Sequence, residues 1–160
     1  MRRVNDAEVL QRIADLGFEL PPAPQPVAAY VSVRIAGATA FVAGQVPIVD
    51  GVVVNPGILG RDVSVDEGRV GAERAALQAL SALRAALGSF DRLLGILQVT
   101  VYVASTPDFA EHPQVANGAS ELLANVLGET GRHARAAIGM VSLPLGACVE
   151  VAVTAEIVPA

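Results

Sequence analysis

The sequence lacks lysine and tryptophan, and among its 160 residues it holds only one cysteine and two histidines. Without lysine the chain cannot form a Schiff base or a P-loop, because both need that amine. The motifs G-x-S-x-G, H-E-x-x-H, C-x-x-C and G-x-G-x-x-G are also missing. The single Cys148 excludes a disulfide within the chain, which agrees with the cytoplasmic location that we expect. Nothing in this pattern predicts a metal or an organic cofactor.

Charge is scarce as well. Charged residues make up 17% of the chain and hydrophobic residues 52%, and the formal net charge is −5. The eleven basic residues are arginines spread along the sequence, so no basic stripe indicates a nucleic-acid partner. No uncharged run reaches the roughly 18 residues that a membrane span needs. A chain this apolar is expected to bury part of its surface against copies of itself.

The hydrophobic periodicity predicts an α+β fold made of one domain, residues 1–160. A short helix over 5–17 and a proline-rich connector at 21–26 precede a core at 28–158 with the order ββαβαββ. Both long helices are expected on one face of a single sheet, and a second subunit on the other, because the strands are apolar on both sides. The predicted strands are 28–35, 39–43, 93–105, 135–141 and 148–158, and the predicted long helices are 65–87 and 113–127.

Two charged residues near the end of the chain are candidates for a site. Arg135 opens one apolar strand beside small neighbours, and Glu150 lies inside the next strand. Taken alone, Arg135 is typical of an edge residue that blocks strand pairing, and Glu150 of a half-solvated strand face. Strand alternation places Cys148 on the side of Glu150, which predicts a buried structural thiol with a raised pKa rather than a nucleophile.

A longer pattern changes this interpretation. The stretch "HARAAIGMVSLPLGACVEV" resembles the signature of the Rid (RidA/YjgF, reactive intermediate deaminase) family, in which an arginine, a Leu-Pro turn and a Val-Glu pair follow one another at this spacing. "AYVSVRIAGATAFVAGQVPI" is similar to the first hairpin of that family, with Tyr30, Gly44 and Gln45 in register. "VANGASELL" supplies Asn117. The resemblance covers residues 28–158, and the added helix in front resembles a longer subgroup.

The resemblance implies a chorismate-mutase-like fold, a homotrimer with three clefts between subunits, and no cofactor. It implies hydrolysis of enamine and imine intermediates of amino acid metabolism to 2-oxo acids and ammonia. Arg135 would hold the substrate carboxylate and Glu150 would position the attacking water. Tyr30, Gly44, Asn117 and the backbone of Ala137 would line the cleft.

The sequence departs from the family at two cleft positions. Ala43 stands where a serine is usual, and Ala137 where bacterial members often carry a cysteine. A non-catalytic trimer that binds small carboxylate metabolites therefore stays an alternative, and Glu150 distinguishes it from the enzyme. The endoribonuclease activity ascribed to some members is disfavoured by the negative net charge.

Overall fold

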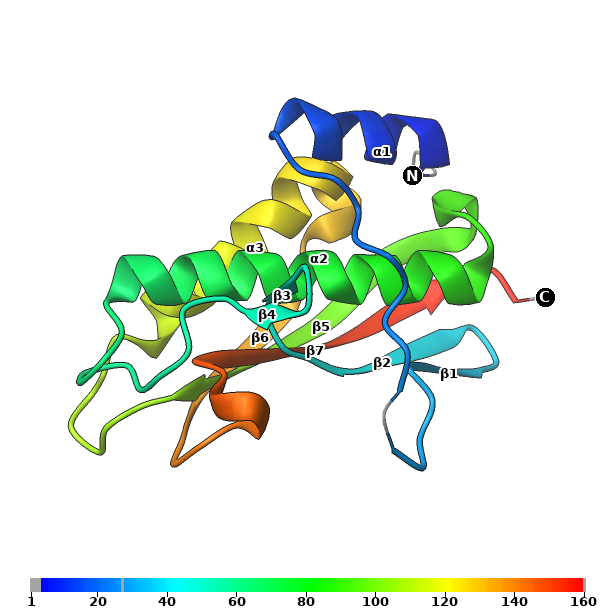
Figure 1. Ribbon diagram of the computed structural model, residues 1–160. Helices are drawn as coiled ribbons and strands as arrows, with labels where there is room; N and C mark the ends of the chain where they lie inside the picture. Colours follow the sequence, from blue (N-terminus) through cyan, green and yellow to red (C-terminus); the bar gives the residue numbers. More distant parts are fainter. Residues whose placement is uncertain (1–3, 27, 160) are drawn as a thin grey trace.

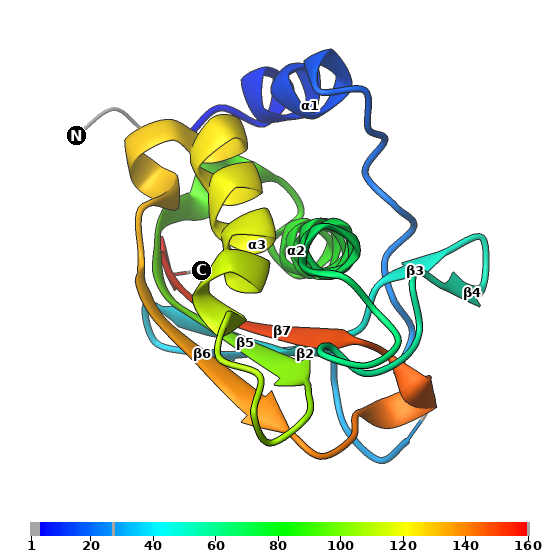
Figure 2. The ribbon, with the colours of Figure 1, turned by 90° about the vertical axis from the view of Figure 1, so that its left-hand side faces the viewer.

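A five-stranded sheet with two long helices on one face forms the centre of the computed structural model, which describes residues 4–26 and 28–159 (Figures 1 and 2). The strand order is β1-β2-β7-β5-β6, and only β5 and β6 run parallel. The sheet strands are β1 (Val33–Ala36), β2 (Thr39–Gln45), β5 (Leu93–Ala104), β6 (Ala134–Met140) and β7 (Val149–Ile157), and the helices are α1 (Asp6–Asp15), α2 (Val65–Leu87) and α3 (His112–Leu127).

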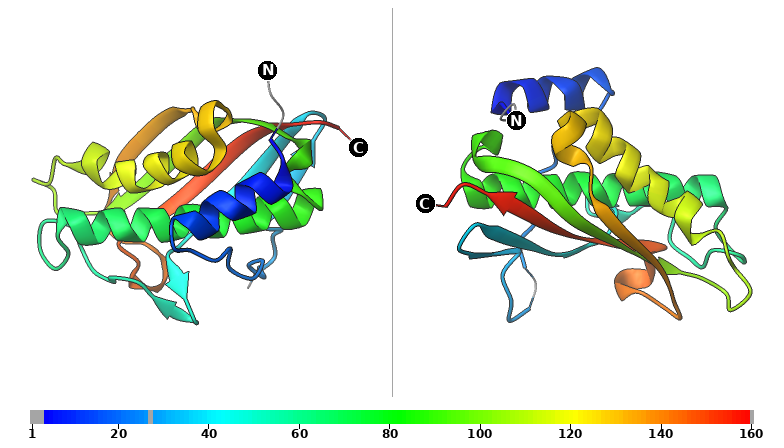
Figure 3. Two further views of the ribbon diagram at one scale, coloured as in Figure 1. Left: turned by 90° about the horizontal axis from the view of Figure 1, so that it is seen from above. Right: turned by 180° about the vertical axis from the view of Figure 1, so that it is seen from behind.

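The two long helices confirm the predicted α+β arrangement. Valines 149, 151 and 153 of β7 point toward α2 and α3 and are buried, and the side chains between them face the other way. None of the three α-helices in the described part of the chain covers that second side of the sheet, which we call the open face (Figure 3). No helix in the described part of the chain has the length and hydrophobicity needed to cross a membrane.

α2 has the bounds that its sequence signals predict. The Ser64 hydroxyl accepts a hydrogen bond from the Glu67 N–H, and the Glu67 carboxylate accepts one from the Ser64 N–H. Gly88 ends the helix in the left-handed region at φ 83°, where a residue without Cβ meets no steric penalty. The cap residues fix the start and end of α2, and its apolar stripe fixes which side lies on the sheet.

The structure differs from the sequence prediction in two places around the first hairpin. β1 begins at Val33 rather than at residue 28, and the Ser32 hydroxyl just before it donates a hydrogen bond to the Pro24 carbonyl at 3.0 Å. The segment expected to be a loop after β2 forms a small hairpin, β3 (Ile48–Val49) and β4 (Val52–Val53). Its two turn residues, Asp50 and Gly51, both have positive φ, which is the geometry that joins short antiparallel strands.

The expectation that Cys148 shares a side with Glu150 is wrong. The Cys148 Sγ lies against Gly71 of α2, on the helix side of the sheet, and the residue is fully buried. Cys148 follows the short helix η3 (Pro144–Gly146) and precedes the first residue of β7, so strand alternation does not yet apply to it. Burial raises the pKa of its thiol to about 11, which agrees with a structural role.

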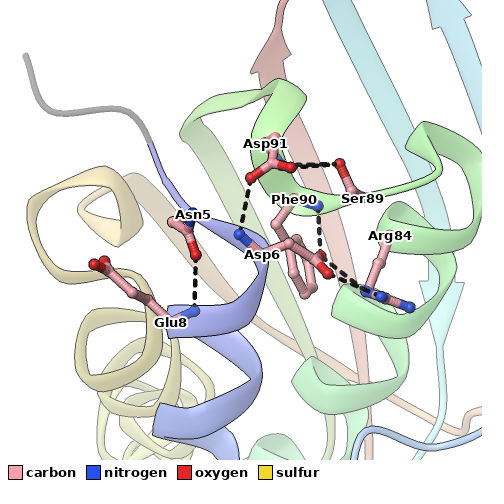
Figure 4. A network of polar contacts seen from close by, with 7 residues as sticks. All are labelled: Asn5, Asp6, Glu8, Arg84, Ser89, Phe90 and Asp91. Carbon is pink, nitrogen blue, oxygen red and sulfur yellow. Dashed lines mark hydrogen bonds and ion pairs between the residues drawn. The ribbon is translucent and has the colours of Figure 1, made fainter.

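The N-terminal helix α1 lies on the far side of α2 and α3 from the sheet, and Asp6 attaches it there (Figure 4). The Asp6 carboxylate accepts two hydrogen bonds from the Arg84 guanidinium, both at 2.9 Å, and one from the Phe90 N–H at 2.8 Å. Asn5 caps the helix by accepting from the Glu8 N–H. The arginine contact holds the pKa of the Asp6 carboxyl below its ordinary value.

Replacing Asp6 by alanine is expected to lower the free energy of unfolding by about 1–2 kcal/mol, the lower part of the range for charged hydrogen bonds, because Arg84 is partly exposed. The contribution of Asp6 is present above the ordinary carboxyl pKa of 3.8 and is lost as the pH falls through the lowered pKa of the folded state. Urea unfolding at neutral and acidic pH measures both effects. Asp15, which accepts a hydrogen bond only from Gln11 on the exposed side of the same helix, is the control, and an equal loss in Asp15→Ala would contradict this account.

Candidate functional site

The first part of the candidate site surrounds Arg135, at the edge of the sheet. β6 pairs only with β5, and its Arg135 side chain reaches α3 on the helix side. Arg135 Nη1 donates to Asn117 Oδ1 at 2.8 Å and to Ser120 Oγ at 3.2 Å, and Nη2 donates to the Pro113 carbonyl at 3.3 Å. Arg135 is exposed and forms no ion pair with any residue in 4–26 or 28–159. The structure thus brings the predicted Arg135 and Asn117 together.

A second layer of hydrogen bonds supports the arginine. The Ser120 hydroxyl lies 3.0 Å from His133 Nε2, and His133 Nδ1 lies 2.6 Å from the Gly131 carbonyl oxygen. A carbonyl can only accept, so Nδ1 carries a proton, and in a neutral ring Nε2 then accepts from Ser120. The Ser120 oxygen is then free to accept from Arg135. Sequence reasoning missed Ser120, although its three-residue spacing from Asn117 places both on one helix face.

Ala137 lies two residues after Arg135, on the same side of β6. In the register of β5 and β6, Arg135 lies beside Val99 and Ala137 beside Val101, and both valines are buried under the helices. Ala137 itself is half-buried. The three predicted residues Arg135, Asn117 and Ala137 therefore form one group, at the β6 edge.

The second part of the candidate site surrounds Glu150. This side chain leaves β7 on the side opposite the buried Val149 and Val151 and lies over the backbone of Gly44. A Cβ atom at position 44 would overlap Glu150 Oε1, so glycine is what lets the carboxylate lie there. Glu150 is half-buried and has no hydrogen bond or ion pair to any described residue. Burial raises the pKa of its carboxyl above the ordinary value of 4.5.

A pocket of about 610 Å³ opens beside this carboxylate. Tyr30, Gly44 and Glu150, three of the predicted site residues, all line it, together with Ala43. Among the described residues that line the pocket, only Glu150 is charged. The described residues hold no cluster of three or more histidine, cysteine, aspartate or glutamate side chains that could bind a metal ion.

The two groups do not meet within one chain. β5 separates β6 from β7, which places the two strands about 10 Å apart. Glu150 lies opposite Tyr102, which is beside Ile138, three residues beyond Arg135, and this adds about 10 Å along the strands. Arg135 points toward the helices and Glu150 away from them, with the sheet in between. One small substrate can therefore contact both groups only if each comes from a different copy of the chain.

Gly44→Ala is expected to lower kcat/KM for imine hydrolysis, the activity proposed below, about ten- to hundred-fold, because the new methyl group displaces the Glu150 carboxylate. Gly44 does not have a positive φ, and the atoms in its way belong to the end of a flexible side chain, so the free energy of unfolding should change by less than about 0.5 kcal/mol. Steady-state kinetics and urea unfolding test the two statements. Gly95→Ala is the control, because its added Cβ meets only an ordinary contact at 3.7 Å, and an unimpaired Gly44→Ala would argue against a role for the Glu150 position.

Comparison with known proteins agrees with the geometry. The family described as "YjgF/chorismate mutase-like, putative endoribonuclease" matches residues 10–157. The chain belongs to this YjgF family. This confirms the Rid resemblance and the chorismate-mutase-like fold that it implied. The site residues rest on geometry and resemblance, since the family match itself assigns no roles.

Three known proteins are similar to this chain over most of its length. Protein TCP17 from Trypanosoma cruzi is 42% identical over 98% of this chain and 99% of its own. The crystal structure of Atu1372 from Agrobacterium tumefaciens, of unknown function, is 42% identical with a TM-score of 0.91, over 96% of this chain and 94% of that one. YjgF from E. coli shares the fold at 22% identity and a TM-score of 0.61, over 84% of this chain and 92% of its own.

Proposed function

We propose that this YjgF-family protein is a homotrimer that hydrolyses reactive 2-imino acids, and the enamines from which they form, to 2-oxo acids and ammonia. The proposal is carried by the observation that Arg135 and Glu150 lie on opposite faces of one sheet and that neither forms an ion pair with a described residue. In the proposed assembly, each of them would contact one part of a ligand and a second copy of the chain would contact the other part. Arg135 of one subunit and Glu150 of the partner subunit would face the same cleft.

Arg135 suits a substrate carboxylate. Its guanidinium has five N–H donors, and contacts with Asn117, Ser120 and Pro113 use three of them. The Nε–H and one Nη2–H remain, two donors on neighbouring atoms that can bind both oxygens of a carboxylate. The same contacts hold the guanidinium in place before the substrate arrives, so little side-chain entropy is lost on binding.

Glu150 suits the chemical step. Water adds to the imine carbon, its proton passes to the carboxylate, and the C=N bond becomes a C–N single bond in a carbinolamine. The carboxylate returns that proton to the nitrogen. The hydroxyl proton of the carbinolamine then passes through the same carboxylate to the nitrogen as the C–N bond breaks and the C=O bond forms, so that a 2-oxo acid and ammonia leave and the carboxylate is regenerated. Burial raises the pKa of Glu150, which makes its carboxylate a better base than that of an ordinary glutamate. The imine carbon is already electrophilic, so an oriented water and one carboxylate suffice.

The open face supports assembly. Three large apolar side chains on this side, Phe41, Ile138 and Met140, are 37–48% exposed in the single chain. Exposed apolar side chains on one face of a sheet are typical of an interface between subunits. The endoribonuclease activity in the family description is less well supported here, because the chain has a net charge of −5 and its arginines are spread along the sequence without forming a basic stripe.

The test is to generate 2-iminobutanoate or 2-iminopropanoate in situ and follow its disappearance with and without the protein, after light scattering has established the mass in solution. We expect a trimer that accelerates hydrolysis. A stable monomer would remove the cleft and with it the proposal. A trimer that binds 2-oxo acids without accelerating hydrolysis would favour the binding-module alternative.

A further inference from the structure

The proline-rich connector between α1 and β1 forms one wall of the Glu150 pocket. Pro22, Pro24 and Gln25 line the same cavity as Glu150 and Gly44. Figure 1 shows the connector descending from α1 across α2 to the side of the sheet where the first hairpin begins. A segment far from Glu150 in sequence therefore bounds the space next to it.

Two hydrogen bonds hold this wall in position. The Ser81 hydroxyl of α2 donates to the Pro21 carbonyl, and the Ser32 hydroxyl donates to the Pro24 carbonyl at 3.0 Å. The prolines themselves fix φ near −65°, so the segment between the two anchors has few other conformations. The wall is a rigid part of the pocket.

The pocket beyond Glu150 is apolar in character. Its two buried or half-buried amides, Gln45 and Gln78, each donate to a backbone carbonyl at 2.9 Å, of Ala43 and Ile48 respectively. The Ser32 hydroxyl donates its proton to the Pro24 carbonyl of the connector. The rest of the lining is largely aliphatic or proline, and no cation is present to hold an acidic group.

We infer that this pocket selects 2-imino acids with a bulky apolar side chain, of the size of leucine, over 2-iminopropanoate. The inference rests on the proposed function, because it takes the reacting carbon to lie at Glu150. The substrate side chain is attached to that same carbon. Its volume must then enter the remainder of the 610 Å³ cavity, against Pro22 and Pro24.

The experiment compares imines generated in situ from leucine, alanine and aspartate by an amino acid oxidase. We expect kcat/KM for the leucine-derived imine to exceed that for 2-iminopropanoate by about ten-fold or more, since each added methylene in a fitted apolar pocket contributes a comparable factor. The aspartate-derived imine should be the poorest substrate. Hydrolysis of 2-iminopropanoate at an equal or higher kcat/KM would overturn the inference while leaving the proposed function intact.

A variant tests whether the connector itself is responsible. The double variant Ser32→Ala, Ser81→Ala removes the hydrogen bonds to the Pro24 and Pro21 carbonyls. It should reduce the preference for the leucine-derived imine about five-fold, which corresponds to the roughly 1 kcal/mol that one such hydrogen bond contributes. Glu19→Ala is the control, because Glu19 lies in the same N-terminal segment but lines a different cavity. An unchanged preference in the double variant would show that the connector does not set it.

A binding measurement separates this inference from the proposed function. Titration calorimetry compares the affinities for 4-methyl-2-oxopentanoate and pyruvate, neither of which requires catalysis. Tighter binding of the branched acid supports the apolar pocket even if no imine is hydrolysed. Equal affinity for the two acids would refute the pocket assignment.

Discussion

Replacing Arg135 by alanine is expected to lower kcat/KM for imine hydrolysis by about 30-fold to several thousand-fold, in a protein that keeps its fold and its assembly. Truncating one partner of a partly desolvated ion pair typically weakens binding by about 2–5 kcal/mol, and roughly 1.4 kcal/mol corresponds to a factor of ten in kcat/KM. Arg135→Lys should recover only part of the loss. A lysine would restore the charge, but it lacks the two neighbouring donors that the Nε and Nη2 atoms present.

Arg132 provides the control for this experiment. It lies three residues before Arg135 and is exposed, and among the described residues its guanidinium donates hydrogen bonds only to the surface carboxylate of Glu129. Arg132→Ala removes the same charge and should leave kcat/KM unchanged. Light scattering on each variant distinguishes a lost contact from a lost trimer. A trimeric Arg135→Ala variant as active as the parent would exclude the role of this arginine as a carboxylate clamp.

Glu150→Gln is expected to slow imine hydrolysis about 10²- to 10⁴-fold, the usual contribution of a positioned acid–base group, while the binding of 2-oxo acids persists. Glutamine keeps the size of the side chain but cannot take a proton from water. Glu156→Gln is the control, because Glu156 lies on the same strand and the same side as Glu150 but at an exposed position outside the pocket. Turnover equal to that of the parent would favour the binding module.

The same substitution should stabilise the fold at neutral pH. Burial raises the pKa of Glu150 in the folded state, so the ionised form is the less favoured one there. The protonated Glu150 carboxyl therefore contributes to the stability of the folded state. This contribution is fully present when the pH is below 4.5, the ordinary pKa, and it is lost as the pH rises through the raised pKa of the folded state. The parent and Glu150→Gln should therefore have similar melting temperatures in acid and differ at neutral pH, with the variant higher. A lower melting temperature for the variant at neutral pH would contradict the assigned environment.

Much of the fold is predictable because its signals are local. The capping box of Ser64 and Glu67, the terminal Gly88 and the apolar stripe between them determine α2 without reference to the rest of the chain. The start of β1 is not predictable in this way. There the chain contacts the proline-rich connector through the bond from Ser32 to Pro24, and no local pattern in the sequence encodes a contact between these two segments.

The candidate site also has parts that the sequence predicts and parts that depend on tertiary packing. Arg135, Glu150, Gly44 and Asn117 are recognisable from their spacing in the signature. Alternation along each strand shows which residues share a side, but it does not show which side of β6 corresponds to which side of β7. That relation depends on β5 lying between them. The support of Arg135 by Ser120 and the proline wall of the pocket are likewise products of tertiary packing.

The central claim is that two subunits together form each site, and mixed trimers test it most directly. Arg135→Ala and Glu150→Gln chains with different tags are co-expressed, and trimers that contain both are isolated by two affinity steps. In every such trimer one of the three clefts combines an intact Arg135 from one subunit with an intact Glu150 from another, so about one third of the parent activity should return. If Arg135 and Glu150 of the same chain formed the site, every cleft would carry a defect and the mixed trimers would be as inactive as the two variants alone.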